Sequence, residues 1–151
     1  MFKAKFEDVN MNSQPLKATA AKGLRAKALE TFPKMEPYID EFWKNKAKVH
    51  MLKLKGDNTI HWVKIEETVC FIEFRDKGLI PMLRLLHKYP DMMDHMLCDK
   101  GAIRHIFSGS NVMAPGLTSE GGKVCPDLPK GAPVAITAEG KKHAMGVGFL
   151  E

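Results

Sequence analysis

Residues 99–116 read DKGAIRHIFSGSNVMAPG, and this stretch decides how the chain is interpreted. Asp99 is a favourable N-cap, because its carboxylate can accept hydrogen bonds from the free N–H groups of a helix's first turn. Gly109 can adopt the left-handed conformation that ends a helix. We expect a short strand over residues 111–113, followed by a turn at Pro115-Gly116. The apolar residues that share one face of the intervening helix are Ala102, Ile103, Ile106 and Phe107.

The loop that follows this helix is the first candidate binding site. A glycine-ended loop between a helix and a strand exposes backbone N–H groups with few side chains in the way. Such a loop suits the close approach of a phosphate or of the edge of a base. The pattern alone favours an ordinary helix–turn–strand connection, so the rest of the chain has to decide.

The elements around this loop predict an α+β protein of two small domains. Over residues 1–91 we expect strands at 2–6, 49–55, 60–65 and 69–75, helices at 16–32, 36–44 and 81–88, and a polar loop at 8–15. Over residues 92–151 we expect strands at 96–98, 134–138 and 143–149 around the helix and loop described above. Mostly short strands with one helix predict a small mixed barrel for this second domain.

Charge is distributed unevenly between these two parts. The chain of 151 residues has a net charge of +5, and all of this excess lies in residues 1–93, whereas residues 94–151 are neutral. We therefore expect the first domain to meet phosphate and the second to recognise its ligand by shape and backbone contacts. A modest basic excess that only aids solubility is the alternative. Four cations lie mostly off the apolar face of the helix over residues 16–32: Lys17, Lys22, Arg25 and Lys27.

Several classes of chemistry receive no support from the sequence. Ser108 and Ser110 do not stand in the nucleophile-elbow pattern of a hydrolase, and no phosphate-binding P-loop is present. His95 and Cys98 have the spacing of metal ligands, but no second ligand pair follows them. The three cysteines are far apart and odd in number, which favours reduced thiols in the cytosol. No apolar run approaches the roughly 20 residues that span a membrane. We expect a cytoplasmic, non-enzymatic protein without metal or cofactor.

Residues 99–116 resemble the signature loop of the PUA domain, an RNA-binding pseudo-barrel. Further motifs stand before and behind this stretch in a fixed order, and together with it they resemble the malignant T-cell amplified sequence family of translation factors, relatives of the N-terminal half of ligatin. The resemblance runs from Phe2 to the last residue and implies a small pre-PUA α/β domain followed by a PUA domain. The flanking motifs are LRLLHKYP at residues 83–90, APGLTS at 114–119, AEGK at 138–141 and HA at 143–144.

The resemblance implies a factor of the small ribosomal subunit that acts in initiation, reinitiation and recycling. The first domain would dock on ribosomal RNA and on a density-regulated-type partner protein, through Lys17, Lys22, Arg25 and Lys27. The PUA domain would hold the acceptor end of tRNA, with base stacking as a minor contribution because residues 94–151 contain no Tyr or Trp. The expected RNA-binding residues are Lys100, Arg104, Ser108, Gly109, Ser110, Asn111, Val112, Met113, Ala114, Lys141, Lys142 and His143.

The end of the chain departs from this family. Members continue for some tens of residues past the position of Glu151, so we expect a PUA barrel that lacks its last elements and leaves one strand edge unpaired. Two other functions are compatible with the residues: a PUA accessory module for tRNA or rRNA modification, and a protein-interaction scaffold whose loop binds no RNA.

Overall fold

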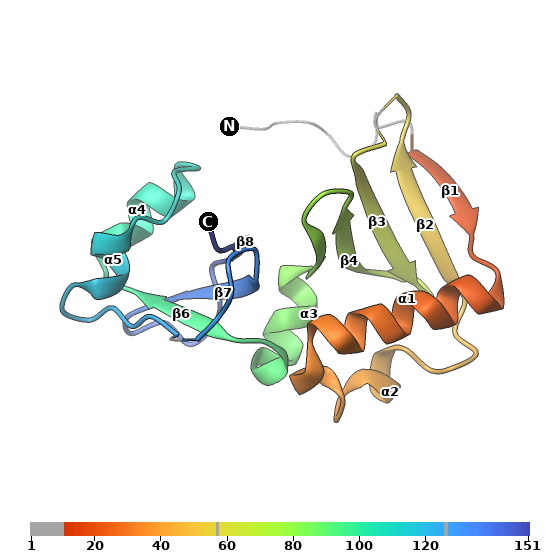
Figure 1. The fold of residues 1–151 in the computed structure, drawn as a ribbon, viewed down its shortest axis with the longest axis horizontal. Helices are drawn as coiled ribbons and strands as arrows, with labels where there is room; N and C mark the ends of the chain where they lie inside the picture. Colours follow the sequence, from red (N-terminus) through yellow and green to blue (C-terminus); the bar gives the residue numbers. More distant parts are fainter. Residues whose placement is uncertain (1–10, 57, 126) are drawn as a thin grey trace. The chain divides into compact units, whose positions relative to one another are not determined.

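A computed structural model describes residues 11–56, 58–125 and 127–151. It mixes helices and sheets, as predicted, and the chain divides into two compact units (Figure 1). The first unit contains the described residues up to Thr31 together with Tyr38–Met82, and the second contains Phe32–Pro37 and Leu83–Glu151. The division into domains at residues 91 and 92 stays a prediction. The strand expected over residues 2–6 lies outside the described residues.

The first unit is built on one antiparallel sheet with the strand order β1-β2-β3-β4-β5. Its three central strands are those that the alternating sequence predicts: β2 (Val49–Leu54), β3 (Ile60–Ile65) and β4 (Thr68–Phe74). Positive φ angles of 93° at Gly56 and 95° at Gly78 lie in the connections that follow β2 and β4. Glycine takes this conformation without steric cost, so the chain can turn sharply at both positions.

Both outer strands of this sheet differ from the prediction. Residues 11–15, expected to be part of a polar loop, form β1 (Met11–Pro15), which pairs with β2. The strand is mostly exposed and therefore carries no hydrophobic alternation, and its backbone pairing alone defines it. The sequence does not predict β5 (Gly78–Pro81) as a strand, because it has only four residues and begins with glycine and ends with proline. The predicted helix at 81–88 accordingly begins later, as α3 (Leu83–Lys88).

Helices complete the core of the first unit. α1 (Ala18–Thr31) confirms the expected helix and buries Leu24 and Ala28. The helix expected over residues 36–44 is shorter and is observed as α2 (Ile39–Phe42). A 3-10 turn, η2 (Pro33–Met35), precedes it in the chain, and the prolines of this segment interrupt a continuous helix. Behind α2 the Trp43 ring packs against Phe71 of β4, with ring centroids 5.7 Å apart.

The second unit contains a smaller sheet with the order β6-β7-β8. β6 (His95–Cys98) runs parallel to β7 (Pro133–Ala138), and β8 (Gly146–Phe149) returns antiparallel to β7. The predicted strands are confirmed, although β8 begins at Gly146 rather than at residue 143. The expected barrel is an open sheet in the described part of the chain. α3 and the 3-10 turn η3 (Pro90–Met92) precede the sheet, and α4 (Ala102–Phe107) and α5 (Ala114–Thr118) lie between β6 and β7.

Candidate nucleic-acid interface

The start of α4 is fixed by Asp99, which follows directly after β6. The backbone N–H of Ala102 donates to one carboxylate oxygen of Asp99 at 2.9 Å, which confirms the predicted cap. The hydroxyl of Ser119 donates to the other oxygen at 2.6 Å. The hydrogen bond from Ser119, followed by that from Ala102, lowers the pKa of Asp99 below its ordinary value of 3.8. A single carboxylate therefore connects the start of α4 to the residue that follows α5.

The end of α4 is closed by the predicted glycine cap. Gly109 has a φ of 87°, and its N–H donates to the carbonyl of Ile106 at 3.0 Å. The N–H groups of Ser108 and Ser110 donate to Arg104 and His105, and the Ser108 hydroxyl donates to the same two carbonyls. Three amides of the expected binding loop, those of residues 108–110, are therefore already engaged within the helix end.

The segment after this cap differs from the prediction. Residues 111–113 form no strand, because they pair with no neighbouring strand, and Pro115-Gly116 lie inside α5 rather than in a turn. Proline in the first turn of a helix loses no hydrogen bond and has the required φ, so the sequence APGLT begins a helix. Gly116 permits α5 to lie close to α4, since a Cβ at this position would be 3.2 Å from the Cβ of Ala102.

A cavity of about 390 Å³ lies between α4, the loop and α5. Among the described residues, no acceptor is found for the backbone N–H groups of Asn111, Val112 and Met113, so these donors remain available. The lining of the cavity is largely apolar. The lining residues are Asp99, Gly101, Ala102, Arg104, His105, Ile106, Asn111, Val112, Met113, Pro115, Gly116 and Ser119.

The structure brings the predicted cations of α4 and of the β7–β8 connection together. The Lys100 ammonium lies 3.9 Å from a carboxylate oxygen of Glu139, and its side chain remains 71% exposed. Directly after Glu139 come the exposed residues Lys141, Lys142 and His143. The His143 ring packs against His87 with centroids 5.2 Å apart, and His87 Nε2 lies 2.8 Å from the carbonyl oxygen of Ala144. Lys100 therefore lies beside the connection that carries Lys141, Lys142 and His143.

Comparison with known proteins places this architecture in a family. The model of the Pre-PUA-like domain matches residues 2–90. The malignant T-cell-amplified sequence 1 homolog of Drosophila melanogaster is 44% identical over 152 residues, covering 99% of this chain and 82% of that protein. The chain belongs to the malignant T-cell-amplified sequence family. Human malignant T-cell-amplified sequence 2 is 39% identical, covering 100% and 82%, and translation machinery-associated protein 20 of Schizosaccharomyces pombe is 35% identical, covering 96% and 78%.

Solved structures support the fold of this family member independently of its sequence. A hypothetical protein from Pyrococcus horikoshii superimposes with a TM-score of 0.69 at 23% identity, covering 91% of this chain and 81% of that one. A PUA domain from Aeropyrum pernix superimposes with a TM-score of 0.65 at 20% identity, covering 93% and 73%. At this level of identity the likeness concerns the fold alone.

The four cations predicted on the helix over residues 16–32 differ in their surroundings. Lys17 and Lys22 are exposed. Arg25 donates through Nε to the carbonyl of Trp43 at 3.1 Å and pairs with Asp40 at 2.7 Å, so it braces α2. Lys27 pairs with Glu73 of β4 at 2.7 Å. Contact of these four cations with the ribosome or with a partner protein stays a prediction. Lys17 and Lys22 are better placed for such a contact, because Arg25 and Lys27 are already paired within the first unit.

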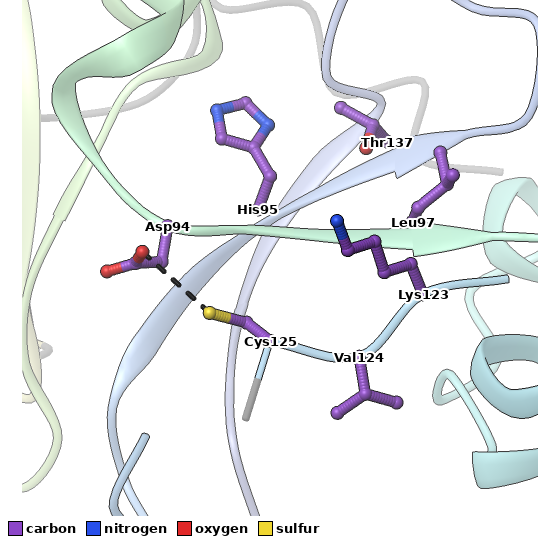
Figure 2. Close-up of a pocket in the computed structure, with 7 residues that line it drawn as sticks. All are labelled: Asp94, His95, Leu97, Lys123, Val124, Cys125 and Thr137. Carbon is purple, nitrogen blue, oxygen red and sulfur yellow. Dashed lines mark hydrogen bonds between the residues drawn. The ribbon is translucent and has the colours of Figure 1, made fainter. Parts of the chain in front are cut away.

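A second cavity, of about 450 Å³, lies along β6 (Figure 2). Cys125 Sγ lies 3.8 Å from a carboxylate oxygen of Asp94, and that carboxylate also pairs with Lys34. His95 Nε2 is engaged with the carbonyl oxygen of Pro90, and the Cys98 thiol is buried. Within residues 11–56, 58–125 and 127–151, no three His, Cys, Asp or Glu side chains converge as a metal site requires. No helix in these ranges is both long and apolar enough to cross a bilayer.

Two apolar side chains beside the site, one of them the predicted RNA-binding residue Met113, are exposed. Phe107 was expected on the apolar face of α4, but its side chain is 71% exposed. Met113 lines the cavity and is 68% exposed. The helical pattern gives the face on which Phe107 lies, but it does not reveal whether another element covers that face.

Proposed function

We propose that this protein is a non-enzymatic RNA-binding translation factor that acts on the small ribosomal subunit in initiation, reinitiation and recycling. Its second unit, a PUA domain, holds the acceptor end of tRNA, and its first unit faces ribosomal RNA and a density-regulated-type partner protein in the cytoplasm. The observation that carries the proposal is the cavity between α4 and α5, which is lined by residues 111–113, whose backbone N–H groups have no acceptor among the described residues, and by Arg104. The name of the fission yeast relative, translation machinery-associated protein 20, supports the process.

The cavity has the properties that an unpaired RNA end requires. Its volume of about 390 Å³ lies within the range of small-ligand pockets, so one or two nucleotides are of suitable size. The free amides of residues 111–113 can donate to phosphate or base oxygens, and the apolar lining can lie against a base. Lys100 and Arg104 stand on the exposed side of α4, where they can neutralise the adjoining phosphates.

The surroundings of the loop hydroxyls support binding rather than catalysis. The Ser108 hydroxyl donates to the backbone carbonyls of Arg104 and His105, so its hydrogen is engaged within the helix end and not directed at a general base. The Ser119 hydroxyl donates to Asp99, whose lowered pKa keeps the carboxylate ionised and structural. These serines stabilise the two helix ends.

Filter binding with intact tRNA and with tRNA that lacks its 3′-terminal CCA tests the proposal. We expect the intact tRNA to bind more tightly, because only the intact end can enter the cavity. Lys100→Ala should weaken binding and lower the slope of log affinity against log salt by about 0.7–0.9, the value for one lost phosphate contact. Lys130→Ala, an exposed lysine elsewhere in the same unit, is the matched control. Equal affinity of both tRNAs for the wild-type protein would refute acceptor-end binding.

Gly109→Val tests the loop separately. A Cβ at Gly109 meets no atom within 4 Å, but its φ of 87° is strained for valine, so the loop and its free amides must shift. We expect weaker binding of intact tRNA while the far-ultraviolet circular dichroism of the protein persists. Co-purification of the wild-type protein with small ribosomal subunits and with a density-regulated-type protein tests the remaining partners.

A further inference from the structure

The exposed face of α4 combines one aromatic ring with two cations. Phe107 follows Arg104 by three residues and Ile103 by four, so their side chains share one side of the helix. Lys100 lies in the turn just before α4, where it approaches Glu139. We call Lys100, Ile103, Arg104 and Phe107 the aromatic face of α4. Figure 1 shows α4 next to α5 and away from the sheet of the second unit.

Charge is concentrated at this face although the surrounding chain is neutral. Residues 94–151 contain six Lys and Arg and six Asp and Glu. Four of these six cations lie on the aromatic face or in the adjoining connection from β7 to β8: Lys100, Arg104, Lys141 and Lys142. Of the acidic residues, Glu139 lies in that connection, and Asp99 is held by Ala102 and Ser119. A polyanion is therefore the ligand that this charge distribution complements.

We propose that Phe107 is a stacking platform for an unpaired base of the bound tRNA end, while Lys100 and Arg104 neutralise the adjoining phosphates. This inference rests on the proposed function and adds a residue to it. A base has an apolar face of about the size of a phenyl ring, and its flanking phosphates are anionic, so an aromatic ring with two cations on one side of it matches part of an unpaired strand. Stacking on Phe107 is therefore a principal contribution, not the minor one that the scarcity of aromatic residues suggested.

The ring is available for this role. Its side chain is 71% exposed, and no aromatic or cation contact to it is found within the described residues. Phe149, the other phenylalanine of residues 94–151, lies half-buried in β8. The cavity between α4 and α5 is lined by Arg104 but not by Phe107. Arg104 therefore connects the two places, and a tRNA end that enters the cavity can place a second nucleotide over the ring.

A binding cycle between the ring and the RNA end tests the inference. Affinities of wild-type protein and Phe107→Ala are measured for intact tRNA and for tRNA trimmed of its unpaired 3′ nucleotides. We expect Phe107→Ala to weaken the binding of intact tRNA by about 5- to 100-fold, because stacking contributes that much per base. The affinity for the trimmed tRNA should be almost unchanged. Phe107→Trp should restore binding, whereas Phe107→Leu should not, because leucine keeps an apolar side chain without a flat ring.

The controls separate this inference from the proposed function. Val124→Ala alters another exposed apolar residue of the same unit and should bind both tRNAs as the wild type does. The salt slope should be unchanged in Phe107→Ala, since no phosphate contact is removed. If wild-type protein prefers intact tRNA and Phe107→Ala does so equally, the stacking role is refuted and the proposed function stands. The stacking role is also refuted if Phe107→Ala binds intact tRNA as tightly as the wild type but no longer binds a protein partner. If wild-type protein does not distinguish the two tRNAs, the proposed function itself fails.

Discussion

The Asp99 carboxylate accepts the hydroxyl hydrogen of Ser119 at 2.6 Å, and this contact joins two helices that together form the candidate site. The same carboxylate caps α4 through Ala102, and the backbone N–H of Asp99 donates to the carbonyl of Gly116 in α5. Both walls of the cavity are therefore held by one residue at the end of β6. A change at Asp99 should affect the shape of the site before it affects the sheet.

Removal of this carboxylate should loosen the site selectively. In Asp99→Ala the capping acceptor for Ala102 and the acceptor for Ser119 are both lost, so α4 and α5 should open more often. Hydrogen exchange should become faster at the amides of α4 and α5, while the amides of β7 keep their protection. Ser119→Ala, which removes only one of the two contacts, should give a smaller effect of the same kind. Equal exchange in wild type and Asp99→Ala would contradict the linking role.

Acid should produce the same loosening in the wild-type protein. The pKa of Asp99 is lower in the folded state than its ordinary value of 3.8, so the unfolded state binds more protons in the range between the two values. The stabilisation is therefore present above about pH 4 and is lost as the pH falls through the folded pKa. Asp99→Asn should lack this component of the acid transition. Parallel acid titrations, followed by hydrogen exchange at Ala102, measure the difference.

The close packing behind α5 can be tested at Gly122. A Cβ at this position would lie 2.5 Å from the carbonyl oxygen of Leu117, and backbone atoms cannot rotate away. Gly122→Ala should therefore lower the free energy of unfolding by about 1–3 kcal/mol, which is typical of overpacking. Gly146→Ala is the control, since a Cβ there meets no atom within 4 Å and its φ is not positive. Urea unfolding of both variants measures the contrast, and similar midpoints would show that the contact relaxes easily.

Elements with strong local signals could be predicted from the sequence, and elements defined by distant partners could not. β2 and β3 alternate between apolar and polar residues and are separated by Gly56, so they were found with nearly correct bounds. β1 was missed because a polar, exposed edge strand is defined by its pairing with β2 and not by its own residues. β5 was missed because four residues are too few for a pattern to emerge.

The same distinction applies to the candidate site. The cap residues Asp99 and Gly109 follow from local chemistry and were found. The predicted strand at residues 111–113 and the predicted turn at Pro115-Gly116 were wrong. A strand needs a partner strand, and the proline of α5 suits a helix start as well as a turn. The proximity of Lys100 to Glu139 depends on the parallel pairing of β6 with β7, which no local pattern predicts.

The core of the first unit should depend strongly on Phe71. Its ring is fully buried against Trp43, with centroids 5.7 Å apart. Phe71→Ala should therefore lower the free energy of unfolding by about 3–5 kcal/mol, whereas Phe71→Leu should cost clearly less because most of the volume is kept. Tryptophan fluorescence during urea unfolding follows the change, and a loss below about 1 kcal/mol in Phe71→Ala would contradict the packing.

Thiol labelling should distinguish the three cysteines. Burial raises the pKa of Cys70 to about 11, so near pH 8 its thiolate fraction is about a hundredfold below that of an ordinary thiol. Burial also raises the pKa of Cys98, whereas Cys125 is partly exposed. An alkylating reagent should therefore modify Cys125 first, and the other two only when the protein unfolds. Mass spectrometry of partially labelled protein gives the order, and early labelling of Cys70 would show that the first unit opens readily.

The pairing of the α1 cations predicts which of them contribute to ribosome binding. Lys17 and Lys22 are exposed, whereas Lys27 is engaged with Glu73. The double variant Lys17→Glu/Lys22→Glu should therefore weaken sedimentation with small ribosomal subunits and reduce its salt dependence, since two phosphate contacts are lost. Lys27→Gln, which removes a charge that is already paired, is the control and should cosediment nearly as the wild type does. The reverse order of effects would place the ribosome-facing surface elsewhere on the first unit.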